Sequence, residues 1–118
     1  GQATRADRAV AWFEARNGST AYEGWCERAV ENSYGTSGRY GSANAAWDDA
    51  VRRGLARTVG TPPRGALVFW DQARPYGHVG VSVGDGTFWA TSVNGRIGRA
   101  RLPYYSGYRG WVPAGTLF

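Results

Sequence analysis

The sequence predicts one α+β domain in which N-terminal helices pack on one side of a small antiparallel β-sheet. Apolar residues recur at helical spacing in the first half of the chain, and the second half alternates apolar and polar residues as strands do. A Gly-Asp-Gly turn at 84–86 predicts a hairpin between two of the strands. The 118 residues are enough for one core and too few for two, so 1–118 is expected to be a single domain.

Three helices are expected before the sheet. Residues 4–17 form the first, which ends at an Asn-Gly pair, and residues 25–33 form a short second helix with Cys26 in its first turn. Ser42 is suited to cap a third helix over 43–55. The apolar positions of the first and third helices are Ala6, Ala9, Val10, Trp12, Phe13, Ala46, Trp47, Ala50 and Val51.

A Pro-rich break at 61–65 separates the helices from the expected strands. The central hairpin pairs residues 78–83 with residues 87–93, and 78–83 alternates strictly between two faces. One of these faces carries three valines, and the other carries His78, Gly80 and Ser82. The remaining strands are expected at 66–70, 96–102 and 110–113.

The net charge is +5, and all fourteen basic residues are Arg. A basic surface favours an anionic partner such as nucleic acid, a membrane surface or a bacterial wall that bears teichoic acid. No Arg-rich run points to nucleic acid, and no stretch approaches the roughly 20 apolar residues of a membrane helix. Neither nucleic-acid binding nor membrane insertion is therefore expected.

The chain has one Cys and one His, which excludes an intramolecular disulfide and a Cys-pair zinc site. No metal or organic cofactor is expected. Cys26 lies at a helix start, where backbone amides and the helix dipole are expected to lower its pKa from about 8.5 and to form an oxyanion hole. His78 begins a strand whose same face is small, at Gly80 and Ser82, which leaves space for the Cys26 helix to approach. Spacing alone does not distinguish this pair from two buried structural residues.

Five segments, in this order along the chain, resemble the NlpC and CHAP superfamily of papain-like cysteine peptidases. Residues 25–30 (WCERAV) resemble its nucleophile helix, and residues 64–70 (RGALVFW) resemble its "G-x-L-V-F-W" strand. Residues 77–86 (GHVGVSVGDG) resemble its His motif. Residues 40–50, with "S-A-x-x-A-W-x-x-A", and 108–112, with "Y-x-G-W", are similar to a phage and wall-hydrolase branch.

The resemblance implies a papain-like fold with Cys26 as nucleophile, His78 as base and a third polar residue on the next strand. The chain departs from the pattern at this third residue: the second His of NlpC-type enzymes falls near Ala90, and the Asp of the wall-hydrolase branch falls at Ser92. A three-residue hairpin loop would place Ser92 opposite His78, and a two-residue loop would place Thr91 there. We predict Ser92 as the orienting residue, with Thr91 and Asn94 as alternatives.

Aromatic and polar residues near these segments are predicted to contact substrate. Tyr22, Glu23 and Trp25 lie just before or beside the nucleophile, while Trp70, Tyr76 and Trp89 flank the strands and are expected to wall the cleft. The alternative interpretation is a solvated loop for Tyr22 and Glu23 and core packing for the aromatic rings.

The function implied by the resemblance is a peptidoglycan amidase or endopeptidase that forms a thioacyl intermediate on Cys26. Its substrate would be the wall peptide, so the protein is expected outside the cell or delivered to a cell wall or periplasm. Roles in wall remodelling, as a lysin or as an antibacterial toxin stay open; the absence of a signal sequence or binding module favours an excised lysin or toxin domain. The sequence says nothing of an immunity or inhibitor protein.

Two other functions stay open. One is a non-catalytic wall- or glycan-binding module that stacks Trp and Tyr rings on sugars. The other is a thiol acyltransferase or deamidase acting on a non-wall substrate, because a thiol nucleophile does not identify its acyl donor.

Overall fold

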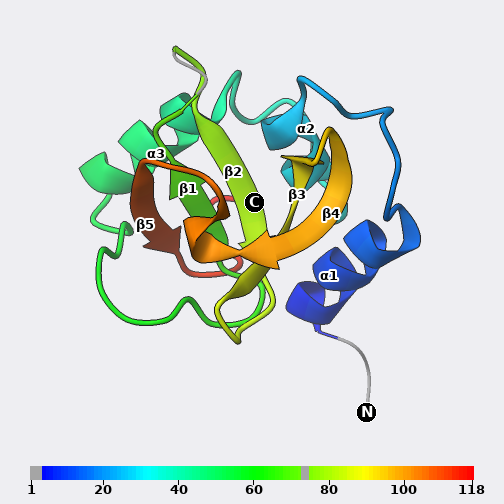
Figure 1. Cartoon of the computed structure of the whole chain (residues 1–118). Helices are drawn as coiled ribbons and strands as arrows, with labels where there is room; N and C mark the ends of the chain where they lie inside the picture. The colour runs from blue at the N-terminus through cyan, green and yellow to red at the C-terminus, as the bar shows by residue number, and fades with distance from the viewer. Residues whose placement is uncertain (1–3, 73–74) are drawn as a thin grey trace.

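A computed structural model describes residues 4–72 and 75–118, and this part of the chain contains three α-helices and a five-stranded antiparallel sheet (Figure 1). The helices are α1 (Arg5–Ala15), α2 (Cys26–Ser33) and α3 (Ala43–Arg52). The strands are β1 (Leu67–Trp70), β2 (His78–Ser82), β3 (Thr87–Val93), β4 (Arg96–Arg101) and β5 (Tyr108–Val112), with a short 3-10 helix, η1 (Leu102–Tyr104), between the last two. The predicted α+β class is confirmed.

The helix starts follow the capping residues. The Thr4 hydroxyl accepts a hydrogen bond from the Asp7 N–H at 3.0 Å as part of a capping box at the start of α1. Ser42 caps α3 as predicted by accepting from the Ala45 N–H at 3.1 Å. The N-cap of α2 is Trp25, which makes no side-chain capping bond, so no capping side chain covers the first amides of the Cys26 helix.

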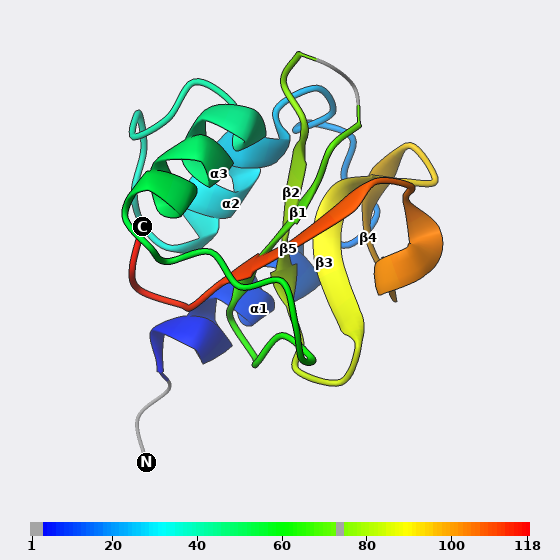
Figure 2. The same ribbon diagram turned by 90° about the vertical axis from the view of Figure 1, so that its left-hand side faces the viewer.

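The sheet has the strand order β4-β3-β2-β1-β5, and the three helices lie on one side of it (Figure 2). The main core fills the space between them, where side chains such as Phe13, Val30 and Trp47 meet the sheet residues Val79 and Val81. A second apolar cluster covers the other face of the sheet and consists of Val68, Trp70, Phe88, Ala90 and Tyr105. Both faces of the central strand β2 are therefore buried.

Helix α3 ends at Arg52, three residues before the predicted end at 55. Its buried residues include Ala46, Trp47 and Ala50, whereas Val51 is 53% exposed. Val51 follows Ala50 by one position, which turns its side chain by about 100° away from the core. Its predicted place in the apolar stripe was therefore wrong.

The β2–β3 hairpin has the predicted three-residue loop. The Val83 N–H donates to the Thr87 carbonyl at 2.9 Å, and Val81 pairs with Trp89 in the same register. Further along β3, the pairing with β4 shifts between Ala90 and Val93. The hairpin is thus regular near its loop and irregular at the end that lies beside His78.

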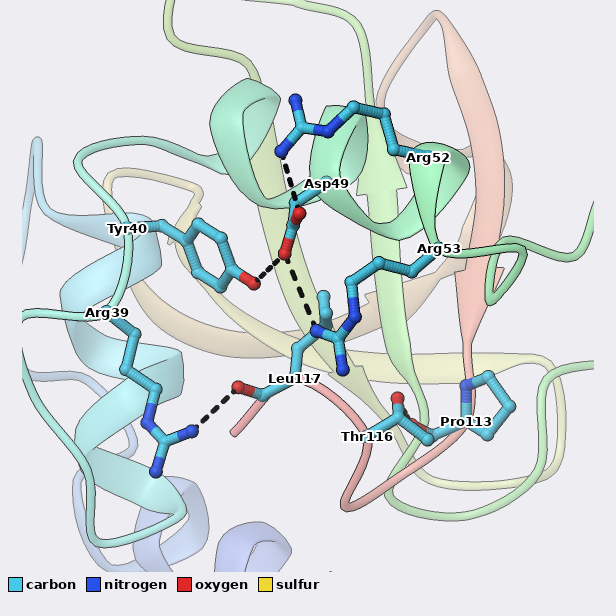
Figure 3. Close-up of polar contacts among 8 residues, drawn as sticks. All are labelled: Arg39, Tyr40, Asp49, Arg52, Arg53, Pro113, Thr116 and Leu117. Carbon is cyan, nitrogen blue, oxygen red and sulfur yellow. Dashed lines mark hydrogen bonds and ion pairs between the residues drawn. The ribbon is translucent and has the colours of Figure 1, made fainter.

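The segment between α2 and α3 is fixed by hydrogen bonds at both of its sides (Figure 3). The Tyr40 hydroxyl donates to the Asp49 carboxylate on α3, and Arg39 Nη1 donates to the Leu117 carbonyl at 3.1 Å. The backbone N–H groups of Arg39 and Tyr40 donate to the Glu31 carboxylate on α2 at 2.9 and 3.1 Å. These contacts hold the 37–43 segment in place next to the start of α2.

Gly65 and Gly86 have nearly the same backbone φ but different surroundings, so alanine variants at the two positions distinguish a steric clash from backbone strain. Gly65 has φ +86° and Gly86 has φ +85°, but a Cβ on Gly65 would lie 2.3 Å from the Ala6 Cβ of α1, while one on Gly86 would meet open space. Both Ala variants incur the left-handed strain, and only Gly65→Ala must also displace α1. We expect Gly65→Ala to lower the free energy of unfolding by about 2 kcal/mol more than Gly86→Ala in urea denaturation. Equal losses would contradict this packing.

Candidate active site

Cys26 is the first residue of α2, and its sulfur lies against the start of β2. The thiol donates to the Gly77 carbonyl oxygen at an Sγ–O distance of 3.8 Å. The backbone N–H groups of Val79, Glu27 and Cys26 itself act on the sulfur and favour the thiolate. The helix start therefore supplies the amide donors that the sequence predicted.

Burial has the larger effect on this thiol. Loss of solvent raises the pKa of Cys26 to about 11, and the nearby Glu27 carboxyl adds to the rise, against the opposite effect of the three amides. The predicted fall in the pKa of Cys26 is therefore wrong for this resting state. The reason is that a negative sulfur, once removed from water, loses more hydration than the helix amides return.

His78 is the first residue of β2 and is 5% exposed. Its ring lies 4.5 Å from the Tyr105 ring and 5.8 Å from the Trp70 ring, measured between centroids. Burial lowers the pKa of His78 to about 4, while the Thr91 backbone carbonyl and the Glu23 charge act in the opposite direction. Its Nε2 is buried and has no hydrogen-bond partner of normal geometry. The imidazole is thus neutral at pH 7 and able to accept a proton.

The Cys26 sulfur reaches the start of β2 from the helix side of the sheet, whereas the His78 ring packs on Trp70 and Tyr105, which belong to the cluster on the other face. The expected approach of the Cys26 helix to the face of His78, Gly80 and Ser82 is therefore wrong, because α2 packs in the same core as the valines of the opposite face. The sulfur of Cys26 contacts the backbone of Gly77 and Val79, which flank His78 on either side. At rest the thiol donates to the Gly77 carbonyl rather than to the imidazole. Gly77 has φ +75°, and a Cβ there would lie 2.2 Å from the Asn44 Oδ1, so a larger residue would disturb the contact.

The three candidates for the third residue lie differently from the prediction. The Ser92 hydroxyl donates to the Glu23 carboxylate at 2.8 Å, and it is the Thr91 backbone carbonyl that acts on the imidazole. Ser92 has φ 60°, which turns it out of the regular strand, and a register argument cannot foresee such a turn. Thr91 acts on His78 through its backbone carbonyl, and the Asn94 N–H donates to the Tyr104 hydroxyl at 2.9 Å.

The predicted substrate-contacting aromatic residues fall into two groups. Trp25 is 58% exposed and Tyr76 is 65% exposed, and both line the cavity beside Cys26. Trp70 is fully buried beneath His78, and Trp89 is packed in the main core, so neither walls the cleft as predicted. Each ring lies on a face of the sheet that is covered by one of the two apolar clusters.

Tyr22 and Glu23, predicted as substrate contacts, make contacts within the chain. The Tyr22 hydroxyl accepts a hydrogen bond from Asn32 Nδ2 at 3.0 Å, and its ring packs edge-on against Trp12 at 5.2 Å. The carboxylate of Glu23 accepts two hydrogen bonds from Ser92. Tyr22 thus fixes the loop before α2 to the helix itself, and Glu23 joins that loop to β3.

A cavity of about 680 Å³ opens beside Cys26. Its walls come from the start of α2, from the 37–43 segment and from Tyr76. Glu27 and Glu31, one turn apart on α2, also line it. Burial raises the pKa of Glu27 to about 9, and its hydrogen bond to Glu31 and the Glu31 charge add to the rise. This carboxyl pair was not predicted from the sequence, although its i, i+4 spacing places both groups on one helix face.

In the part of the chain that comprises residues 4–72 and 75–118, no helix has the length and apolar character needed to cross a membrane. No group of three or more His, Cys, Asp or Glu side chains within it is arranged to hold a metal ion.

No protein-family model matches the chain, and no curated protein matches it either. The fold does match the crystal structure of an NlpC/P60 family protein from Bacillus cereus, with a TM-score of 0.64 and 21% sequence identity. The match covers 91% of this chain and 39% of that chain, so this chain spans about two fifths of the length of its structural neighbour. At this identity the likeness establishes the shared NlpC/P60 fold.

The buried thiol predicts a specific pH dependence of alkylation. Because the pKa of Cys26 is raised to about 11, the thiolate is scarce at pH 7. We expect iodoacetamide to react roughly 100-fold more slowly than with a free cysteine at pH 7, and the rate to rise about tenfold per pH unit up to about pH 10. Intact-protein mass spectrometry of samples quenched at successive times measures this rate. A plateau below pH 8 would contradict the raised pKa.

The raised pKa of Glu27 predicts a pH-dependent stability difference. The unfolded chain releases the Glu27 proton above its ordinary pKa of 4.5, whereas the folded chain keeps it until about pH 9, so stability is lost as the pH rises through this window. Glu27→Gln cannot undergo this loss. The difference in free energy of unfolding between Glu27→Gln and wild type should therefore grow by about 2 kcal/mol in favour of the variant as the pH rises from 4.5 to 7. This value allows for screening of the Glu27 charge by solvent. Exposed Glu14→Gln is the control, and a pH-independent difference for Glu27→Gln would contradict the assignment.

Proposed function

We propose that this chain is a cysteine peptidase that cleaves an amide bond in the peptide of the bacterial cell wall. The observation that supports it most strongly is the position of the Cys26 sulfur, at the start of a helix and against the strand segment that carries His78. The cavity beside the sulfur and the NlpC/P60 fold support the same proposal.

In the proposed reaction the Cys26 thiol attacks the carbonyl carbon of the substrate amide. The thiol proton passes to the His78 imidazole as the S–C bond forms, and the carbonyl oxygen takes the negative charge. The imidazolium then protonates the leaving amine, the C–N bond breaks, and a thioester remains on Cys26. Water attacks this thioester and gives a proton to His78, and that proton returns to the sulfur when the S–C bond breaks.

The pKa values of the resting site favour a neutral starting pair. The pKa of Cys26 is raised to about 11 and that of His78 is lowered to about 4, so at neutral pH the thiol keeps its proton and the imidazole is a free base. His78 therefore acts as a general base during attack rather than holding a preformed ion pair. The amides of Cys26 and Glu27, which already act on the sulfur, are suited to stabilise the oxyanion.

The surroundings of Cys26 are consistent with a wall substrate. Trp25 and Tyr76 present exposed rings at the cavity, where they can pack on a sugar or on an apolar peptide side chain. The net charge of +5 favours an anionic wall surface. A wall substrate would in turn require the protein to act outside the cell or in the periplasm.

One observation favours a second candidate function, a non-catalytic wall- or glycan-binding module. A thiol whose pKa is raised to about 11 is a poor nucleophile until something draws off its proton, and the same exposed Trp25 and Tyr76 rings would serve binding alone. This candidate predicts affinity for the wall that survives alkylation of Cys26, without any turnover.

Digestion of purified peptidoglycan tests the proposal. Wild type should release peptide fragments that mass spectrometry identifies, and Cys26→Ala and His78→Ala should each lower the rate by a factor on the order of 10³ or more. Glu14→Gln, an exposed change on α1, should retain the wild-type rate. Fragments released equally by Cys26→Ala would sink the cysteine mechanism, while no fragments from any variant would favour the binding module.

A further inference from the structure

Glu23 lies in the turn before α2, and both of its carboxylate oxygens are bound by one residue of β3. The Ser92 N–H donates to Oε1 at 2.6 Å, and the Ser92 hydroxyl donates to Oε2 at 2.8 Å. Hydrogen bonds to a carboxylate are charge-assisted, which makes them stronger than neutral ones. The contact joins the loop that leads into Cys26 to the strand that neighbours His78.

The backbone at Ser92 is shaped for this contact. Ser92 has φ 60°, in the left-handed region, which costs a non-glycine residue roughly 1 kcal/mol or more. The β3–β4 pairing runs through Ala90 and resumes only at Val93, so Ser92 stands outside the regular ladder. Its N–H is therefore available to a side-chain acceptor, and the bonds to Glu23 offset the strain.

The Ser92 N–H and the Thr91 carbonyl belong to the same peptide group. The Thr91 carbonyl oxygen accepts a hydrogen bond from the Tyr105 hydroxyl at 2.8 Å and also acts on the His78 ring as an acceptor. When a carboxylate accepts a hydrogen bond from the N–H of a peptide group, amide resonance shifts electron density of that peptide group onto its carbonyl oxygen. That oxygen, which is bound by the hydroxyl of the tyrosine that packs on the His78 ring, becomes a stronger acceptor as a result.

The other titratable groups around His78 do not supply a negative charge at neutral pH. Cys26 on α2 keeps its proton because burial raises its pKa to about 11. Burial likewise raises the pKa of Tyr105, which packs on the His78 ring, and of Tyr108, which contacts Trp70. Glu23 is thus the acidic group in this set that can balance a positive imidazole.

We propose that Glu23 is a positioning residue for His78: its carboxylate polarises the Thr91–Ser92 peptide group, whose carbonyl orients the imidazole and stabilises the imidazolium formed when Cys26 gives up its proton. The inference rests on the proposed peptidase function for its catalytic consequence. Its structural part, the effect of Glu23 on the imidazole through a peptide group, stands apart from any substrate. Glu23 would thereby supply, from the loop before the nucleophile, the charge that β3 lacks.

The test uses the ring ¹⁵N chemical shifts of His78, which are unambiguous because the chain has one His. At pH 7 we expect one dominant tautomer in wild type, with its N–H directed at the Thr91 carbonyl. Glu23→Gln keeps the size and the acceptor oxygen but removes the charge, and it should move the two ring shifts toward each other. Glu14→Gln is the matched control for loss of one exposed carboxylate and should leave them unchanged.

Ser92→Gly distinguishes an effect of Glu23 through the Ser92 backbone N–H from an effect through the Ser92 hydroxyl. Glycine keeps the backbone N–H and accepts φ 60°, so the ring shifts should stay near those of wild type. Unchanged shifts in Glu23→Gln would overturn the proposal, as would a Ser92→Gly variant that reproduces the Glu23→Gln change. If Glu23→Gln does not fold, Glu23→Asp replaces it, because the shorter side chain cannot reach the Ser92 N–H. Ring shifts that move toward each other would then support the proposal, and unchanged shifts would overturn it.

Kinetics on wall peptide supply a second readout. Glu23→Gln should lower kcat roughly tenfold with little change in KM, because it acts on the proton transfer rather than on binding. A raised KM with unchanged kcat would contradict the positioning role. The ¹⁵N shifts need no substrate, so an inactive wild type would refute the proposed peptidase function while leaving the effect of Glu23 on His78 to be decided by the shifts.

Discussion

The contact between the first turn of α2 and the start of β2 determines the chemistry of this domain. Ala29 and Val30 of the helix pack in the same core as Val79 and Val81 of the strand, and this packing presses the Cys26 sulfur onto the strand backbone on both sides of His78. A cysteine at a helix start is a common feature, but here the helix is seated so that the sulfur has amide donors from two elements. The cavity, the buried imidazole and the Glu23 contact all lie near this contact between α2 and β2.

The same burial that brings these groups together also removes their charges. Cys26 and Glu27 are protonated and His78 is neutral at pH 7, because each would lose hydration if it ionised. A hydrolase built this way must create its ion pair during the reaction and hold it with fixed dipoles and a nearby carboxylate. The helix amides can stabilise the sulfur and the oxyanion, and Glu23 can stabilise the imidazolium. The resting neutrality is therefore compatible with catalysis and accounts for the expected slow alkylation.

The sequence predicted the elements well because their local signals agree with the tertiary packing. Ser42 caps α3, the strict alternation of β2 separates two buried faces, and the Gly-Asp-Gly loop sets the register of the hairpin. The site was predicted less completely. The direction of the Cys26 pKa shift depends on how deeply α2 is seated, and the role of Ser92 depends on a local turn to φ 60°. Neither the depth nor the turn leaves a periodic signal, and the Glu23–Ser92 contact joins residues 69 positions apart.

In the proposed mechanism Cys26 forms a covalent thioester with the acyl part of a wall peptide. Rapid acid quenching of the protein mixed with a soluble wall-peptide fragment, followed by intact-protein and peptide mass spectrometry, would detect this intermediate. We expect a mass increase equal to the acyl fragment, located on the Cys26 peptide and removed by hydroxylamine, which cleaves thioesters. Peptide hydrolysis that proceeds with no adduct on Cys26, or an adduct that persists in Cys26→Ala, would contradict it.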